Sequence, residues 1–246
     1  MKILLISDLH ANSVALSAIE EEFDVCLCLG DLVEYGVDPL PCIEWVRKRA
    51  HVAVRGNHDH STVQRVQTSS RNECRRLAAA TRELHARMLH SMHWKFLARL
   101  PVTRMVQIEG KTFYLVHATP RDPMDEYLGP DAAAWEQRLA DIEADYVCVG
   151  HTHVPYVLSL PRCTVINPGS VGQPRDGDPR ASYAVIENGQ VTLKRVAYDV
   201  EAAVHQLQRS GLSDDLVEIA STILRTGGRL TTNNSAAQGA FTRGIG

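Results

Sequence analysis

Residues 24–31, which read Asp24-Val25-Cys26-Leu27-Cys28-Leu29-Gly30-Asp31, decide the fold. The middle of this stretch is a continuous apolar run, which predicts a strand buried on both faces of a sheet. Gly30 ends the run, and the carboxylate of Asp31 follows immediately. Ligands of open α/β sheets bind in the crevice outside the carboxyl ends of the strands. Asp31 is therefore predicted to lie at the ligand-binding or catalytic site.

The first part of the chain alternates between strand and helix around this stretch. Apolar strands are expected at residues 3–6, 25–29 and 51–54. Ser13 can cap a helix over residues 14–22, and Pro39 or Pro41 can open a second helix that ends near residue 49. Strands separated in this way by helices predict consecutive right-handed βαβ units on a parallel sheet.

Residues 60–100 are predicted to form a helical insert near the site. A helical pattern runs over residues 71–88, and a shorter one runs over 92–100. Arg71, Arg75 and Arg82 share one face of the longer helix. This stripe could meet an anionic substrate, but a solvated helix face is the favoured interpretation.

The second half of the chain is rich in strands. Hairpins are expected at 105–116, 154–166 and 181–196, the last around Asn188-Gly189, a strong hairpin signal. Helices are expected at 131–142, 200–208 and 213–224, and a further buried strand at 146–149. We therefore expect one mixed α/β domain over residues 1–225, followed by a Gly/Asn/Thr/Ser-rich tail over residues 226–246.

Composition narrows the classes of function. The chain has 246 residues, of which 44% are hydrophobic and 22% charged, which is typical of a globular domain. A net charge of −3 argues against electrostatic binding of long nucleic acid. No apolar run approaches the length of a membrane-spanning helix. The six cysteines form no C-x-x-C pair, and three of them lie inside apolar strand runs, which indicates small buried hydrophobic residues. The apolar run at residues 1–8 is too short for a signal peptide, so we expect reduced thiols and a cytoplasmic protein.

Five predicted strands end in residues that can bind metal. The segments are Asp8-Leu9-His10, Gly30-Asp31, Gly56-Asn57-His58-Asp59, His117 and Gly150-His151-Thr152-His153. Imidazole, carboxylate and amide groups suit divalent ions such as Mn, Fe or Zn. Each segment alone is a weak signal, but five in order are not explained by separate structural roles. The remaining histidines are assigned ordinary core or surface roles: His51, His60, His85, His90, His93 and His205.

Taken together, these segments resemble the motif set of the calcineurin-like metallophosphoesterases. Three longer stretches are similar to a bacterial and archaeal, phosphodiesterase-like branch: residues 30–36, residues 54–59 and residues 167–176. The resemblance spans residues 1 to about 225. It implies a four-layer α-β-β-α sandwich of two mixed sheets flanked by helices.

The resemblance also implies roles for individual residues. One metal ion would be held by Asp8, His10, Asp31 and His153, and the other by Asp31, Asn57, His117 and His151. His58 would be the acid that protonates the leaving oxygen, with Glu34 as a candidate partner. The chain departs from the family pattern at Ala11 and Ala118, where glycine is usual, and at Tyr35, where protein phosphatases of the family have an arginine that grips phosphate.

These roles imply hydrolysis of a phosphoester with two divalent ions, by in-line attack of a metal-bound hydroxide. A phosphodiesterase acting on a small or nucleotide-like substrate is the favoured interpretation. The alternatives are a phosphomonoesterase, a dinucleoside-polyphosphate phosphatase or a protein phosphatase. A catalytically silent scaffold of the same fold is the non-enzyme alternative. The sequence does not identify the substrate, the metal or the oligomeric state.

Overall fold

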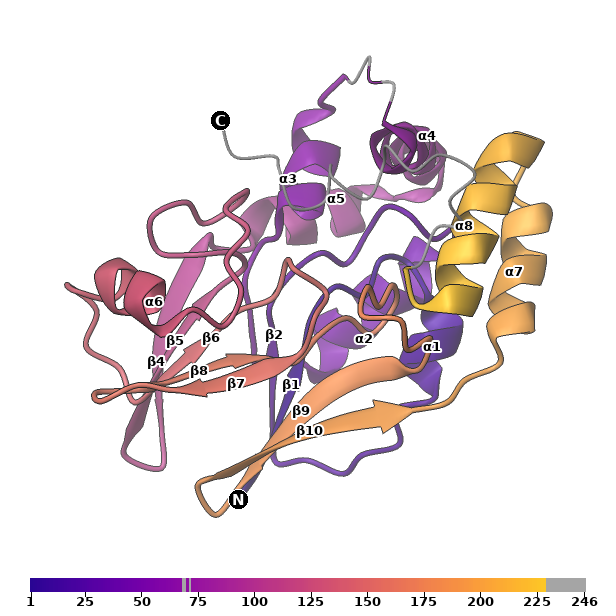
Figure 1. Cartoon of the computed structure of the whole chain (residues 1–246). Coiled ribbons are helices and arrows are strands. Elements are labelled where there is room, and N and C mark those ends of the chain that lie inside the picture. Colours follow the sequence, from indigo (N-terminus) through magenta and orange to yellow (C-terminus); the bar gives the residue numbers. More distant parts are fainter. Residues whose placement is uncertain (68–69, 71, 229–246) are drawn as a thin grey trace.

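The computed structural model describes residues 1–67, 70 and 72–228, which form two five-stranded sheets with helices on their outer sides (Figure 1). The first sheet has the strand order β10-β9-β1-β2-β3. Its strands β1 (Lys2–Ile6), β2 (Val25–Cys28) and β3 (Val52–Ala53) are parallel. The hairpin of β9 (Ala181–Glu187) and β10 (Gln190–Val196) extends the sheet in antiparallel fashion from β1. The predicted parallel first half is confirmed.

The second sheet has the order β4-β5-β6-β8-β7. Here β5 (Lys111–Val116), β6 (Tyr146–Cys148) and β8 (Thr164–Asn167) are parallel. The edge strands β4 (Thr103–Ile108) and β7 (Tyr156–Ser159) pair in antiparallel fashion with β5 and β8. The three predicted hairpins are therefore present, and both sheets are mixed.

Three apolar clusters hold the layers together. Between the sheets, residues of β1 and β2 such as Leu5 and Leu27 pack with Phe113 and Ile166 of the second sheet. The outer face of the first sheet packs against α1 (Ser13–Ser17), α2 (Pro39–Arg49) and α5 (Ser91–Arg99). The outer face of the second sheet packs against α6 (Ala132–Arg138), whose Trp135 is fully buried. The predicted four-layer α-β-β-α sandwich is confirmed.

The remaining helices lie beyond this sandwich. Three of them, α4 (Glu73–Met88), α7 (Val200–Gln208) and α8 (Asp214–Thr226), share an apolar cluster that includes Leu77, Val204 and Leu224. The helix α3 (Asn57–Gln64) follows β3 and was not predicted. Of the predicted tail over residues 226–246, the part from residue 229 onward lies outside the described residues. Among the residues that are described, no helix has the length and apolar character needed to span a membrane.

The helix predicted over residues 14–22 is shorter than expected and has a different cap. The side chain of Asn12, rather than Ser13, accepts the capping hydrogen bond from the Ala15 backbone N–H. The Ser13 hydroxyl instead donates to Asp38. The helix stops at Ser17. In the segment that follows, Glu21 forms ion pairs with Lys2 of β1 and Lys194 of β10, so this side chain binds the first sheet.

Candidate metal centre

The carboxyl ends of strands from both sheets meet at one edge of the sandwich. Asp8 and His10 follow β1, Asp31 follows β2, and Asn57 opens α3 directly after β3. From the second sheet, His117 follows β5, and the turn after β6 supplies His151 and His153. The structure therefore brings all seven predicted metal ligands to the same edge.

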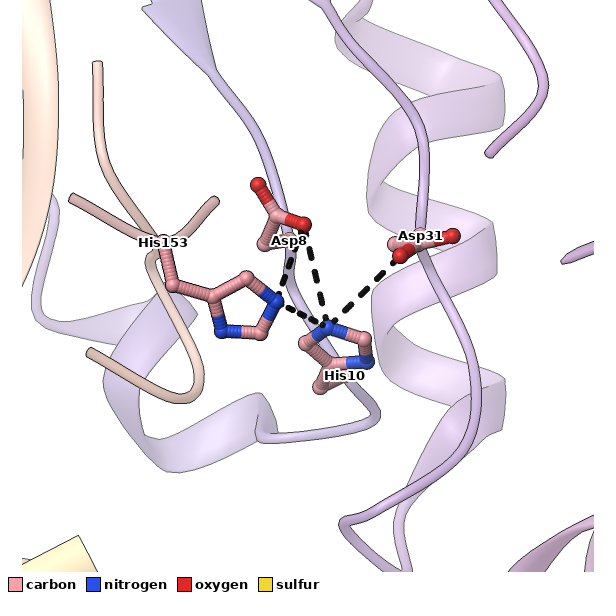
Figure 2. A group of neighbouring side chains, drawn as sticks. All are labelled: Asp8, His10, Asp31 and His153. Atoms are coloured by element: carbon pink, nitrogen blue, oxygen red, sulfur yellow. Dashed lines mark hydrogen bonds and ion pairs between the residues drawn. The ribbon is translucent and has the colours of Figure 1, made fainter. Parts of the chain in front are cut away.

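Four of these side chains form one group of candidate ligands: Asp8, His10, Asp31 and His153 (Figure 2). All four are buried, and their ligand atoms lie within 4.8 Å of one another. The Nε2 atoms of His10 and His153 are 3.1 Å apart, and His153 Nε2 is 3.2 Å from Asp8 Oδ1. Two imidazole nitrogens at this separation need a proton or a cation between them.

A second group shares Asp31 with the first and adds His117 and His151. His117 Nε2 lies 3.1 Å from Asp31 Oδ2 and 3.1 Å from Asn57 Oδ1. Asp31 is thus the only residue of the described chain that belongs to both groups. The Oδ2 atom of Asp31 faces both groups, at 3.8 Å from His10 Nε2 and 3.1 Å from His117 Nε2, so this oxygen could contact two neighbouring cations.

The unsatisfied polar atoms of the site are the atoms that would face a cation. Asp8 Oδ1, Asp31 Oδ2 and His151 Nε2 are buried, and apart from the neighbouring imidazole nitrogens already named they have no hydrogen-bond partner. Buried polar groups are nearly always paired, because an unpaired one costs free energy. A set of carboxylate oxygens and imidazole nitrogens fits a borderline divalent ion such as Mn, Fe or Zn. The residues present therefore fit the metal ions that the sequence predicts.

Backbone carbonyls fix the orientation of three candidate ligands. The Nδ1 atoms of His10, His117 and His153 lie 3.0, 2.7 and 2.6 Å from the carbonyl oxygens of Val33, Leu29 and Gln173, respectively. Donation from Nδ1 leaves Nε2 as the basic nitrogen that points into the site. This arrangement is the usual second layer around histidines that bind metal.

Several ligand residues have backbone conformations that non-glycine residues rarely adopt. The φ angles of Asp8, His10, Asp31, His151 and His153 are 54°, 45°, 56°, 66° and 59°. Residues in the left-handed region carry strain that the surrounding fold must overcome, and they cluster at functional sites. The tight turns aim these side chains at one point just beyond the strand ends.

Two glycines allow the turns after β2 and β3 to approach each other. A Cβ atom at Gly30 would collide with the backbone of Gly56, and a Cβ atom at Gly56 would collide with the Asp31 carboxylate. Asp59, fully buried in α3, joins the same two turns. Its carboxylate accepts from the backbone N–H groups of Asp31, Leu32 and Gly56 at 2.8, 2.8 and 3.1 Å. The close contact between the two turns and the hydrogen bonds of Asp59 therefore fix the position of Asp31.

The electrostatics keep Asp31 ionised and His151 neutral, as metal binding requires, and favour a proton on His117 that a metal ion would have to displace. Burial raises the pKa of Asp31, but the neighbouring histidines His117 and His58 outweigh burial, so this pKa is well below its usual range. Burial lowers the pKa of His151 to about 3. Burial also acts to lower the pKa of His117, but Asp31 and Asp8 raise it to about 10. Without a cation, a proton on His117 offsets one of the two carboxylate charges, and metal binding would release that proton.

His58 lies beside both groups and belongs to neither. Its backbone N–H donates to Asp31 Oδ1 at 2.9 Å, and its ring centroid is 5.0 Å from that of His10. Its Nδ1 is 2.6 Å from Glu34 Oε2. Burial acts to lower the pKa of His58, but the carboxylates of Asp31 and Glu34 outweigh it, so the pKa is raised above its ordinary value. The predicted contact between His58 and Glu34 is present.

Arg82 holds the Glu34 carboxylate from α4. Its Nε is 2.6 Å from Glu34 Oε1 and its Nη2 is 3.1 Å from Oε2, while the Thr62 hydroxyl donates to Oε1 at 2.9 Å. The prediction of a solvated face is wrong for Arg82, which is 9% exposed. The cause is that α4 packs this face against the turn that carries Glu34. Arg75 is exposed as predicted, and Arg71 lies outside the described residues.

Two further residues of α4 bind the same turn. The Thr81 hydroxyl oxygen accepts from the Tyr35 backbone N–H at 2.9 Å. His85 is fully buried; its Nδ1 accepts from the Glu34 backbone N–H at 3.2 Å, and its Nε2 donates to the Gly36 carbonyl at 3.0 Å. Sequence reasoning did not assign Thr81, Arg82 or His85 to the site. The sequence feature that could have indicated their role is the spacing of these polar residues, which lie about one helical turn apart on the face next to Leu77.

These two bonds need neutral His85, so we expect it to make stability depend on pH. Burial lowers the pKa of His85 to about 4, whereas an unfolded histidine titrates near 6.5. Between these two pH values the unfolded chain binds a proton that the folded chain does not. The free energy of unfolding therefore falls as the pH drops from 6.5 towards 4, by at most roughly 3 kcal/mol. An amide can make both bonds without titrating. Urea unfolding in chelator should therefore show a shallower loss of stability for His85→Gln, and parallel curves for the two proteins would contradict this.

The site is buried at the strand ends of two mixed sheets, and one carboxylate is shared by two groups of candidate metal ligands. This arrangement is typical of metal-dependent hydrolases. Residues 1–190 match the profile of the calcineurin-like phosphoesterase superfamily domain. The chain belongs to this family and is a metal-dependent phosphoesterase. The predicted family and enzyme class are thereby confirmed.

Relatives come from archaea and bacteria. The uncharacterized protein MJ0912 of Methanocaldococcus jannaschii is 31% identical over 239 residues, covering 88% of this chain and 96% of its own. A crystal structure of a metallophosphoesterase from Sphaerobacter thermophilus is 36% identical, covers 92% of this chain and 99% of its own, and has a TM-score of 0.76. The phosphodiesterase YfcE of Escherichia coli K12 is 26% identical over 211 residues, covering 78% of this chain and 91% of its own. The chain is thus similar to a bacterial and archaeal branch of the family.

Proposed function

We propose that the protein is a dinuclear-metal-dependent phosphodiesterase that hydrolyses a small or nucleotide-like phosphoester. The observation that carries the proposal is the sharing of Asp31 by two groups of buried candidate ligands, next to the His58–Glu34 pair. The phosphodiesterase named among the relatives, YfcE, supports the choice of a diester. The net charge of −3 argues against long nucleic acid as the substrate.

Asp8, His10, Asp31 and His153 would hold one divalent ion, and Asp31, Asn57, His117 and His151 the other. When bound, such a pair of ions stabilises the negative charge of the phosphate and activates the attacking water. The two carboxylates, Asp8 and the shared Asp31, contribute two negative charges, whereas two divalent ions would contribute four positive ones. The site would therefore attract a phosphate although the whole protein is negatively charged.

His58 would give its proton to the departing oxygen. Glu34 accepts from Nδ1, so the other ring nitrogen, Nε2, is left to carry the transferable proton. The carboxylates of Asp31 and Glu34 raise the pKa of His58 and so favour the protonated ring, which is the state that a general acid needs. His58 is 13% exposed at its side chain, so a substrate can reach it from solvent.

A direct assay tests the proposal against its alternatives. The protein is stripped of metal, reloaded with manganese, and assayed on a bis-aryl and a mono-aryl phosphate ester. We expect two ions per chain and faster hydrolysis of the diester. Preference for the monoester would favour a phosphomonoesterase or a phosphatase. Absence of hydrolysis and of bound metal would favour the scaffold, an alternative that complete ligand positions and His58 argue against.

Glu34→Gln should shift the pH dependence of hydrolysis. The carboxylate raises the pKa of His58, so its loss lowers that pKa. The rate falls with rising pH as the acid loses its proton, and in the variant this alkaline limb of the kcat profile should move to lower pH. At neutral pH, kcat should fall by less than the ~100- to 10,000-fold that a general acid itself supplies.

The exposed residue Glu136 of α6 provides the matched control, because Glu136→Gln removes the same charge from a side chain that does not act on the pKa of His58. Glu34→Gln also leaves the Arg82 guanidinium without its carboxylate partner, which should cost about 3–5 kcal/mol of folding stability. Activity is therefore measured well below the unfolding temperature of the variant. An unshifted alkaline limb would show that Glu34 does not act through His58.

A further inference from the structure

The loop that follows β8 packs against His153 and places a guanidinium next to the candidate metal centre. The Gln173 carbonyl lies 2.6 Å from His153 Nδ1, and the Arg175 backbone N–H donates back to the His153 carbonyl at 3.3 Å. The Arg175 side chain is also positioned, because its Nη2 donates to Gln173 Oε1 at 2.9 Å. The position of Arg175 is thus tied to a residue of the first candidate ligand group.

The guanidinium lies over an aromatic ring that contacts the site. Arg175 Cζ is 5.5 Å from the ring centroid of Tyr35, within the range of a cation–π contact. The Tyr35 ring is in turn 4.7 Å from the ring of His10 and 4.7 Å from the ring of His58. Tyr35 therefore supports the positive charge beside both a candidate metal ligand and the proposed acid.

Arg175 has no carboxylate partner among the described residues, although acids are close to it in the sequence. Asp176 pairs with Arg195, and Asp178 pairs with Arg180. Arg175 is only partly exposed and is charged at any working pH. Removing an arginine from water without a counter-charge is costly, so this position favours an anion that arrives from outside the chain.

The geometry of a guanidinium suits one such anion in particular. Its planar fork donates two parallel hydrogen bonds to a phosphate, which is a stronger and more directional contact than an ammonium makes. We propose that Arg175, supported by Tyr35, binds the non-bridging oxygens of the substrate phosphate. This inference rests on the proposed function and adds a substrate-binding residue to it.

Phosphate binding to the manganese-loaded protein tests the assignment independently of turnover. Isothermal titration with inorganic phosphate should show affinity weakened by about 10- to 100-fold in Arg175→Gln, which is the usual effect of losing hydrogen bonds to a charged group. Arg175→Lys should retain part of the affinity, because it keeps the charge and loses the fork. Both variants should bind as much manganese as the wild type. Competitive inhibition of diester hydrolysis by phosphate should weaken in parallel.

Arg180→Gln is the matched control, because Arg180 is an exposed arginine five residues further along the chain that pairs with Asp178. It should bind phosphate as the wild type does. If the wild type is active and Arg175→Gln binds phosphate as tightly as the wild type does, this inference is overturned and the proposed function is not. Loss of manganese from Arg175→Gln would also overturn it, since the residue would then support the metal site. A metal-loaded wild type that neither binds phosphate nor hydrolyses an ester would overturn the proposed function itself.

Discussion

Asp31→Asn is expected to remove both the bound metal and the hydrolytic activity. Asp31 belongs to both candidate ligand groups, so one substitution affects both sites. The new amide can keep its oxygen toward the His58 backbone N–H, which Asp31 Oδ1 accepts at 2.9 Å. This orientation turns the NH₂ group toward the position of Oδ2, where a cation needs an acceptor. Such ions stabilise the transition state by several kcal/mol, so we expect kcat to fall by a factor on the order of 1,000 or more.

Metal content and thermal unfolding measure this outcome without a substrate. Manganese that binds the folded chain should raise the unfolding temperature of the wild type, and the variant should lose most of that increase. The exposed residue Asp141 offers a control, because Asp141→Asn removes an equal charge outside both candidate ligand groups. An Asp31→Asn protein that retained two ions per chain and the wild-type rate would show that the carboxylate does not bridge two cations.

The sequence was sufficient to predict the candidate metal ligands because each follows directly after an apolar strand. Parallel strands bring their carboxyl ends to one edge of a sheet, so position along the chain translates into position in space. Asp31 after β2 and His117 after β5 illustrate this, although they belong to different sheets. Their 3.1 Å contact then depends only on the packing of the two sheets against each other.

The residues around the ligands were harder to predict because they depend on tertiary contacts. The burial of Arg82 follows from the packing of α4 on the turn at Glu34, and the two residues are 48 positions apart. In the sequence, Arg82 differs in no way from Arg75, which is exposed. The helix α3 was missed for a related reason. Its first turn is polar, and its Asp59 is buried because it binds backbone groups of another turn rather than because it is apolar.

His58→Ala should slow hydrolysis strongly while metal binding survives. The ring is outside both candidate ligand groups, so two ions per chain should remain. Loss of a general acid typically costs ~100- to 10,000-fold in rate. The cost should depend on the leaving group, because a good leaving group departs without a proton. We therefore expect the full loss with an alkyl ester and a much smaller loss with a nitrophenyl ester.

This dependence separates an acid from a residue that merely supports the fold, since a misfolded site would slow both substrates alike. The alkaline limb of the kcat profile should also disappear in His58→Ala, because the group whose raised pKa defines it is absent. His205→Ala, at an exposed position of α7, is the matched control and should leave both the rate and the profile unchanged. Equal losses for the two kinds of ester would contradict proton donation by His58 and leave the His58–Glu34 contact a structural one.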